Sequence, residues 1–339
     1  MLAKKRILVT GGAGFIGSAL IWALNRRGLQ NILVADVLKQ DEKWKNLVPL
    51  RFADYLEADE LLRLVRDNSP RIADIGSIFH LGACSATTER DASYLIRNNY
   101  EYTKELADWA LAHGARFVYA SSAATYGDGS KGMSDSADLT TLRPLNMYGY
   151  SKHLFDLYAQ RQGVLEHLVG VKYFNVFGPN EGHKGDMRSL VHKAYGQVVK
   201  DGVIRLFASD RPDYADGEQK RDFLYVKDAV EMTIHLAESQ RAGGLYNLGS
   251  GEANSWNTLA RAIFSALDRE PRIEYIPMPE ILRAKYQYFT QAEIGKLRET
   301  GYDRPITPLA DSVADYVRNY LVPESFLGDE ALSGTGRAI

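Results

Sequence analysis

The sequence has a single cysteine, Cys84, among its 339 residues. One cysteine cannot form an internal disulfide, which is typical of proteins from a reducing compartment. No apolar run approaches the roughly 20 residues that a membrane-spanning helix needs. The segment from Met1 to Arg6 leads directly into a β-rich run and not into the apolar segment of a signal peptide. We therefore expect a cytoplasmic protein that does not bind a membrane.

The sequence also lacks a predominant charge and a metal-binding pattern. Its 41 basic and 43 acidic residues give a formal net charge of -2, so overall charge does not favour nucleic acid or an anionic membrane as a partner. The seven histidines show no metal-ligand spacing with cysteine or carboxylate residues. We predict no metal site and no nucleic-acid partner.

Up to about residue 175, short β-rich runs alternate with helical patterns, which is typical of a parallel sheet wound by crossover helices. The predicted fold class is α/β, with a Rossmann-type doubly wound parallel sheet and a smaller α/β lobe. Strands are predicted at residues 7–10, 32–36, 50–54, 77–81, 117–121 and 169–175, and helices at 15–27, 57–65, 102–113 and 151–162.

A glycine-rich turn, Thr10 to Gly17, joins the first predicted strand to the first helix. Gly11 permits a tight turn, Gly14 lets the backbone approach a phosphate, and Gly17 lets the helix pack closely on the strand. The helix N-terminus adds free N–H groups. Glycine spacing alone fits an ordinary strand, turn and helix equally well. Asp36, about 20 residues further on at a strand end, is placed to bind a ribose hydroxyl and favours a nicotinamide dinucleotide site.

The chain beyond Gly178 is less regular, which predicts a second lobe. We assign residues 1–175, with returning segments 221–250 and 304–322, to a dinucleotide-binding domain, and residues 176–220 and 251–303 to a substrate-binding lobe. The tail, residues 323–339, has weak periodicity and is expected to be disordered.

A tyrosine and a lysine stand four residues apart where a helix begins, so Tyr148 and Lys152 share one helical face. Tyrosine has a pKa of about 10, and a nearby ammonium group lowers this pKa by favouring the phenolate. The spacing alone also fits an exposed Tyr/Lys pair. Hydroxyl groups at the end of the strand 117–121 would complete a Ser-Tyr-Lys set.

With these motifs the chain resembles the extended short-chain dehydrogenase/reductase family. The resemblance rests on four ordered motifs, at residues 10–17, 121–127, 148–152 and 221–228. It implies that Tyr148 is a catalytic acid/base, that Lys152 binds the nicotinamide ribose, and that Ser122, four positions before Tyr126, orients the substrate.

Further strings, above all Glu181-Gly-His-Lys184-Gly185, look like the ADP-glyceromanno-heptose 6-epimerase subfamily. That likeness implies inversion of carbon 6 of ADP-D-glycero-D-manno-heptose by transient oxidation and re-reduction, which supplies a lipopolysaccharide precursor. It also implies that Lys184 is a second acid/base, facing Tyr148 across the substrate. Without the resemblance, Lys184 would be interpreted as a phosphate-binding or solvated loop lysine.

The resemblance also implies a set of cofactor-binding residues. Besides Lys152 and Lys184, they are Gly11, Gly14, Phe15, Ile16, Gly17, Asp36, Val37, Lys43, Asp54, Leu81, Gly82, Ala83, Cys84, Ser85, Asn98 and Val176. Asp36 alone favours NAD, whereas Lys43 matches a lysine that helps such epimerases to accept NADP. We expect NADP, with NAD as the alternative. Asp54, matched to an adenine contact, fits a helix N-cap equally well, and we interpret the Cys84 thiol as packed and not nucleophilic.

The implied substrate-binding residues come from both lobes. They are Ser122, Asn175, Asp186, Lys193, Phe207, Ala208, Ser209, Asp210, Arg221 and Tyr286. Three features depart from the subfamily: Lys193 stands where a histidine is common, Asp186 replaces a small residue, and the segment 209–220 is longer.

Two alternative functions stay open. One is another nucleotide-sugar epimerase or reductase of the same family, and the other is a catalytically silent NADP-sensing protein. Dehydratases of this fold carry Thr-Asp-Glu where this chain has Ser122-Ala-Ala, which argues against dehydration. Sensors commonly lose the Tyr/Lys pair, which is intact here. The resemblance further implies a homo-oligomer, such as a pentamer.

Overall fold

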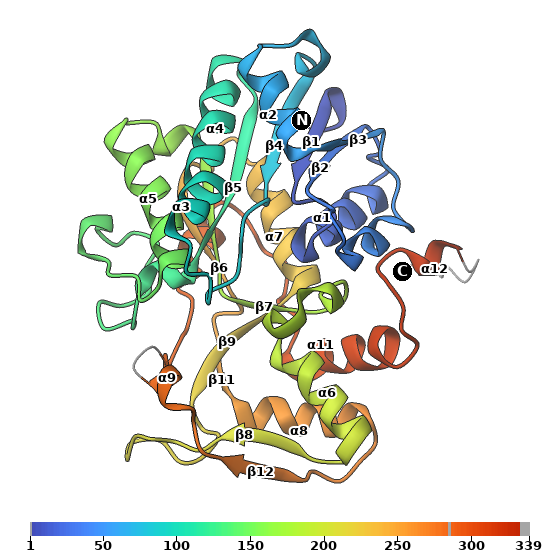
Figure 1. Cartoon of the computed structure of the whole chain (residues 1–339), viewed down its shortest axis with the longest axis vertical. Coiled ribbons are helices and arrows are strands. Elements are labelled where there is room, and N and C mark those ends of the chain that lie inside the picture. Colours follow the sequence, from blue (N-terminus) through green and yellow to red (C-terminus); the bar gives the residue numbers. More distant parts are fainter. Residues whose placement is uncertain (1, 284–285, 333–339) are drawn as a thin grey trace.

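The computed structural model describes residues 2–283 and 286–332, and within them seven parallel strands form the central sheet (Figure 1). Their order across the sheet is β3-β2-β1-β4-β5-β6-β10. The strands are β1 (Arg6–Thr10), β2 (Ile32–Asp36), β3 (Asp54–Glu57), β4 (Ile75–His80), β5 (Arg116–Ser122), β6 (Val169–Tyr173) and β10 (Gly244–Leu248). The order reverses between β1 and β4, which is where ligands bind in such sheets. The predicted fold class is confirmed.

Helices cover both faces of this sheet, because its strands are apolar on both sides. Helices α1 (Phe15–Arg26) and α7 (Val226–Glu238) lie on one face, where Ile7 and Val9 share a core with Leu20. Helices α2 (Ala58–Arg66), α4 (Tyr102–Ala112) and α5 (Met147–Arg161) lie on the other, where Leu8 packs with Leu61. The ends of the strands are left open for a site.

A smaller lobe lies below this sheet in Figure 1. It contains a sheet of β11 (Ala253–Ser255), β9 (Lys220–Tyr225) and β7 (Asn175–Phe177), and the parallel pair β8 (Ile204–Phe207) and β12 (Ile273–Ile276). Its main helices are α6 (Leu190–Asp201) and α8 (Trp256–Ala266). The shorter helices of the chain are α3 (Ala92–Leu95), α9 (Glu280–Arg283), α10 (Gly295–Glu299), α11 (Leu309–Tyr316) and α12 (Asp329–Leu332).

Single helical turns complete the chain. The 3-10 turns are η1 (Leu2–Lys4), η2 (Glu42–Leu47), η3 (Pro70–Ile72), η5 (Ala123–Tyr126), η6 (Leu139–Thr141), η7 (Leu165–His167) and η8 (Gly182–Met187), and π-helical turns are η4 (Ile96–Glu101) and η9 (Val317–Leu321). In the part of the chain that the structure describes, no helix has both the length and the apolar character to cross a membrane.

Several predicted boundaries are wrong. The third strand covers 54–57 and not 50–54, because Leu50 packs against the core below η2 and does not pair with β2. The strand predicted at 169–175 is two strands, since the chain leaves the main sheet at Phe174. Helix α5 begins at Met147 and not at 151, because the Asn146 side chain caps it by accepting from the Gly149 N–H at 2.8 Å.

The C-terminal tail is also more ordered than predicted, up to residue 332. Helix α12 lies within it, and the Trp22 indole N–H donates to the Glu330 carboxylate at 2.8 Å. The Leu327 N–H donates to Asn180 Oδ1 at 3.0 Å. The rest of the predicted disordered tail, 333–339, lies outside the described residues.

Candidate functional site

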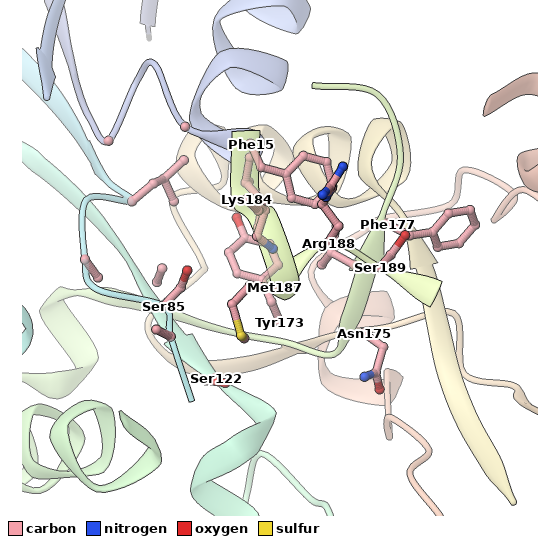
Figure 2. A pocket seen from close by; sticks show the side chains of 18 of the residues that line it. Phe15, Ser85, Ser122, Tyr173, Asn175, Phe177, Lys184, Met187, Arg188 and Ser189 are labelled. Carbon is pink, nitrogen blue, oxygen red and sulfur yellow. The ribbon is translucent and has the colours of Figure 1, made fainter. Parts of the chain in front are cut away.

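A cavity of about 710 Å³ lies where β1, β4 and β5 end (Figure 2). The glycine turn that follows β1 forms part of its wall, together with Ser122 from the end of β5 and residues of η8. Figure 2 shows Lys184 beside Phe15 in this cavity, with Ser122 on the other side of the view. The cavity therefore joins the main sheet to the loop that leads into the smaller lobe.

The backbone of the glycine turn packs more closely on its own neighbours than any side chain would allow. Gly11 has φ +65°, and a Cβ there would lie 2.6 Å from the backbone nitrogen of Gly82. A Cβ on Gly17 would lie 2.0 Å from the carbonyl oxygen of Gly11. Gly14 stands at the N-cap of α1 and has no side chain to cover the free N–H groups. These features fit the pyrophosphate of a dinucleotide.

Asp36, at the end of β2, braces the same turn. Its carboxylate accepts from the N–H groups of Ala13 at 2.9 Å and Val37 at 2.7 Å, and Lys43 Nζ lies 2.7 Å from Oδ1. The Asp36 side chain is buried, so the Lys43 ammonium offsets its charge. A second cavity, of about 510 Å³, continues from Asp36 past Lys39 and Arg97.

Tyr148, Lys152 and Ser122 meet on the cavity wall. Burial raises the pKa of the half-buried Tyr148, and a hydrogen bond with Ser122 lowers it by a smaller amount. The predicted lowering of the Tyr148 pKa by Lys152 is therefore not found: burial is the largest influence on this pKa, and it raises it. Lys152 is 4% exposed. Burial lowers its pKa to about 8, and the Asp156 carboxylate one turn further along α5 raises it.

Lys184 approaches the cavity on η8. Its Nζ lies 5.2 Å from the centre of the Phe15 ring. Burial lowers the pKa of Lys184, while the nearby Glu181 carboxylate raises it. Glu181 is fully buried and accepts from the Ser189 N–H and hydroxyl, both at 2.6 Å, which fixes the loop that carries the lysine. A partly dehydrated lysine of this kind can exist in the neutral form that a base needs.

Asn46 connects the glycine turn to the loop that precedes η8, two segments beside the larger cavity. Its side-chain amide donates to the carbonyl of Ala13 at 2.9 Å and to that of Asn180 at 3.1 Å. Asn180 in turn donates to Ser18 Oγ at 3.0 Å. We call this arrangement the Asn46 clasp. It ties the glycine turn to the loop that carries Lys184.

Arg221 is held between aromatic rings in the smaller lobe. Its guanidinium carbon lies 5.6 Å from the Trp256 ring centre and 5.0 Å from that of Tyr286, and the Trp256 N–H donates to the Tyr286 hydroxyl at 2.8 Å. Burial lowers the pKa of Arg221. Arg221 Nη1 donates to the carbonyl of Lys220 at 2.8 Å. Trp256 lines the larger cavity, whereas Arg221 and Tyr286 line neither cavity. The remaining guanidinium donors are of the kind that binds an anion.

Comparison with known proteins identifies the family. The model of the NAD dependent epimerase/dehydratase family matches residues 7–249. The chain belongs to this family. The predicted resemblance to the extended dehydrogenases, of which this family is a part, is confirmed.

Two curated relatives within the epimerase/dehydratase family cover almost the whole chain. An ADP-L-glycero-D-manno-heptose-6-epimerase of Nitratidesulfovibrio vulgaris is 55% identical over 316 residues, which is 93% of this chain and 97% of the relative. One of Fusobacterium nucleatum is 43% identical over 330 residues, covering 94% and 98%. The predicted likeness to this subfamily is therefore confirmed.

Solved structures of other epimerases have the same fold as this chain. The Helicobacter pylori ADP-L-glycero-D-manno-heptose-6-epimerase superposes with a TM-score of 0.78 at 27% identity, covering 94% of this chain and 96% of that one. A UDP-N-acetylglucosamine 4-epimerase from Methanobrevibacter ruminantium has a TM-score of 0.80 at 22% identity. At that identity the likeness shows the fold alone.

Most of the residues that we predicted to bind the cofactor lie in the walls of the two cavities. The larger cavity brings together all four predicted catalytic residues with Gly11, Gly14, Phe15, Ile16, Gly17, Asp36, Lys43, Leu81, Gly82, Ala83, Cys84, Ser85 and Val176. Val37 and Asn98 line the second cavity. Asp54 lines neither: it begins β3, whereas Glu57, at the other end of this strand, stands beside Asp36, so the adenine contact stays a prediction.

The predicted substrate residues are more scattered. Asn175 and Ser122 line the larger cavity. Phe207, Ala208 and Ser209 lie half-buried at the end of β8, and the exposed Asp210 pairs with Arg283 at 3.1 Å. Asp186 and Lys193 are exposed and line neither cavity, and their contacts with the substrate stay a prediction.

The sequence reasoning missed Trp256, Arg188 and His183, which all line the larger cavity. His183 lies within the Glu181 to Gly185 motif, so its position next to Lys184 could have indicated that it lies at the site. Trp256 begins α8 far along the chain and reaches the cavity only through packing of the two lobes. No pattern within its own segment points to that role.

Proposed function

We propose that this protein is an epimerase that converts ADP-D-glycero-D-manno-heptose to ADP-L-glycero-D-manno-heptose by inverting carbon 6. The observation that carries the proposal is the placement of Tyr148 and Lys184 on one cavity that also holds the glycine turn. The relatives at 43% to 55% identity, matched over more than nine-tenths of their length, support the choice of substrate.

The reaction needs a hydride acceptor, because a carbinol C–H remote from any carbonyl is not acidic. A nicotinamide dinucleotide bound along the glycine turn supplies this chemistry by taking up hydride and returning it to the opposite face of the transient ketone. Either Tyr148 or Lys184 removes the hydroxyl proton, and the other protonates the new alkoxide. Burial lowers the pKa of Lys184, which favours its neutral, proton-accepting form. Burial raises the pKa of Tyr148, which favours its proton-donating form. Ser122 orients the substrate hydroxyl through its own hydroxyl group.

Binding of the substrate depends on the smaller lobe. The diphosphate is assigned to the Arg221 guanidinium, which Trp256 and Tyr286 hold in place, and the heptose to the part of the cavity beside Asn175. The rings of Trp256 and Tyr286 limit the rotamers of Arg221, which favours a planar two-point contact with phosphate oxygens.

NADP is our proposal for the natural cofactor. The Lys43 ammonium, 2.7 Å from the Asp36 carboxylate, offsets the charge that would repel a 2′-phosphate. Lys39 and Arg97 line the cavity next to it. The affinities for NADP and NAD, measured by fluorescence titration, test this choice. Lys43→Ala should weaken NADP at least about tenfold more than NAD, and equal losses for both cofactors would contradict the proposal.

The function itself is tested by incubating the purified protein with ADP-D-glycero-D-manno-heptose and following the configuration at carbon 6 by NMR. We expect epimerisation without consumption of added cofactor. Absence of the epimer, with and without NADP, would overturn the assignment. The Tyr148→Phe, Lys184→Met double variant serves as the control, and full activity in that variant would overturn the roles given to the two residues.

We further propose a cytoplasmic homo-oligomer. The single cysteine, Cys84, supports the reducing compartment, and the subfamily likeness supports assembly. Sedimentation velocity of the purified protein tests the second point, and a species with the mass of one 37.9 kDa chain would contradict it.

A further inference from the structure

A charged cluster lies behind the catalytic residues and outside both cavities. Asp156, on α5, and Lys172, on β6, are fully buried, and Lys172 Nζ lies 2.7 Å from Asp156 Oδ2. The Tyr119 hydroxyl donates to Asp156 Oδ1 at 2.9 Å and the Ser121 hydroxyl donates to Oδ2 at 2.8 Å. The Asp156 carboxylate thus has three donors.

The chain makes room for this cluster at a specific position. A Cβ on Gly170 would lie 2.5 Å from the Tyr119 hydroxyl, so glycine at that point of β6 allows Tyr119 to reach Asp156. A buried ion pair is weak support for stability, because apolar residues of similar size often do as well. Its retention directly behind an active site calls for another explanation.

The cluster contacts both elements that carry catalytic groups. Tyr148, Lys152 and Asp156 follow one another at four-residue spacing on α5 and share one face. On the other side, Lys172 Nζ donates to Thr125 Oγ1 at 2.7 Å, and the Thr125 hydroxyl donates to the carbonyl of Ser122 at 2.8 Å. The ion pair therefore bridges the helix of Tyr148 and Lys152 to the turn of Ser122.

Asp156 also affects the pKa of Lys152 through its charge. On its own helix, the Lys152 ammonium faces Asp156 and Tyr148. It also faces His80, at the end of β4, and Cys84, in the loop that follows β4. His80 is neutral, since burial lowers its pKa to about 3, and burial raises the pKa of the Cys84 thiol. Of these neighbours, Asp156 is the one carboxylate, and it raises the pKa of Lys152.

We propose that Asp156 and Lys172 are a positioning pair that fixes Tyr148 and Lys152 against the Ser122 turn and holds Lys152 in its ammonium form. Lys172 and the two hydroxyls aim the Asp156 carboxylate, and Asp156 supplies the field at Lys152. Neither residue touches the substrate. The proposal rests on the proposed function only for its catalytic readout.

The test replaces the pair by neutral groups of similar size in Asp156→Asn, Lys172→Met, which leaves no buried unpaired charge. Lys152 acts as a cation, so activity falls as the pH rises through its pKa, and Asp156 raises that pKa. Removing the pair should therefore move the alkaline limb of the pH profile of kcat to lower pH by about one unit. The acid limb, set by Lys184 across the cavity, should stay in place.

Two matched variants separate charge from packing. Tyr119→Phe removes one hydrogen bond to Asp156 without a change of charge, and Lys172→Arg keeps the ion pair; both should keep the alkaline limb of the parent protein. If the double variant does not fold, as judged by thermal unfolding, Asp156→Asn, Lys172→Gln is measured, which also leaves no buried unpaired charge, and the same displacement is expected. If a folded variant that lacks the Asp156 and Lys172 charges keeps its alkaline limb in place, the proposal is overturned.

A second readout does not need the sugar substrate. The affinity for reduced dinucleotide is followed by the fluorescence of the dinucleotide between pH 6 and 10. This affinity should weaken with rising pH as Lys152 loses its proton, and in the double variant the weakening should begin at a lower pH. If the protein fails to epimerise ADP-heptose but shows this shift, the proposed function fails and the positioning pair stands. Identical binding profiles for parent and variant would refute the pair.

Discussion

At the scale of single residues, Gly17 and Gly196 differ in what a methyl group would meet. A Cβ on Gly17 would lie 2.0 Å from the Gly11 carbonyl oxygen, whereas a Cβ on Gly196, in the middle of α6, would have no heavy atom within 4 Å. Gly17→Ala should reduce stability by about 1–3 kcal/mol and weaken dinucleotide binding at least tenfold. Gly196→Ala should increase stability by about 0.5–1 kcal/mol. Urea unfolding and fluorescence titration check both, and equal effects would contradict the close approach at Gly17.

His80 gives a pH dependence of stability. Its ring nitrogens lie 2.7 Å from Thr10 Oγ1 and 3.0 Å from Thr103 Oγ1, and burial lowers its pKa from 6.5 to about 3. The unfolded chain therefore binds a proton between these values that the folded chain does not bind, so stability should fall as the pH falls through this window. The contribution approaches about 1.4 kcal/mol per pH unit.

Urea unfolding at several pH values between 7 and 4 measures this slope, since each curve gives the free energy of unfolding at one pH. His80→Asn keeps a polar group but cannot titrate, and its slope should be smaller than that of the parent protein. Parallel slopes in the two proteins would show that His80 is not the group responsible.

At the scale of elements, the loop that carries Lys184 depends on Glu181. The Gly178 N–H and the Ser189 hydroxyl donate to one carboxylate oxygen and the Ser189 N–H donates to the other, so an amide in its place would set an N–H group against a donor. Glu181→Gln should reduce stability by about 1–3 kcal/mol. Loss of the negative charge also lowers the pKa of Lys184 further, and the acid limb of activity should move to lower pH. The exposed Glu238→Gln, on α7, should change neither quantity.

Elements with strong local signals were predictable, and those fixed by distant contacts were not. The glycine turn and the presence of a helix at Tyr148 are determined within their own segments, so both follow from the sequence, although the start of that helix does not. The run from Leu50 to Asp54 has the apolar pattern of a strand, but Leu50 is used for the core below η2 and pairing starts only at Asp54. Because of that shift, Asp54 begins the strand that it was predicted to end.

At the scale of the whole molecule, the site depends on packing between segments that are far apart in sequence. Arg221 could be named from its motif, but the rings that hold it come from α8 and from the segment after α9. The same applies to the Asp156 and Lys172 pair, whose members lie on a helix and on a strand. Spacing along the chain carries no information about such contacts.

The Asn46 clasp makes a prediction at this scale. Asn46→Ala removes the donor to the carbonyls of Ala13 and Asn180 and should lower stability by about 1–3 kcal/mol. Saturating dinucleotide should raise the Tm of the parent protein by a few degrees, and the rise should be smaller in the variant. Differential scanning fluorimetry measures both, with the exposed Asn319→Ala as the control; an unchanged rise in Asn46→Ala would contradict the role of the clasp.

The clasp also bears on how the enzyme relates to the metabolism around it. If a dinucleotide lies between the glycine turn and the Lys184 loop, as proposed above, the Asn46 contacts that join the two would slow its release, so we expect one molecule to serve many successive turnovers. The rate would then be insensitive to the ratio of oxidised to reduced dinucleotide in the cellular pool. Epimerisation of this kind could continue unchanged through shifts in nutrition that alter every reaction drawing on that pool.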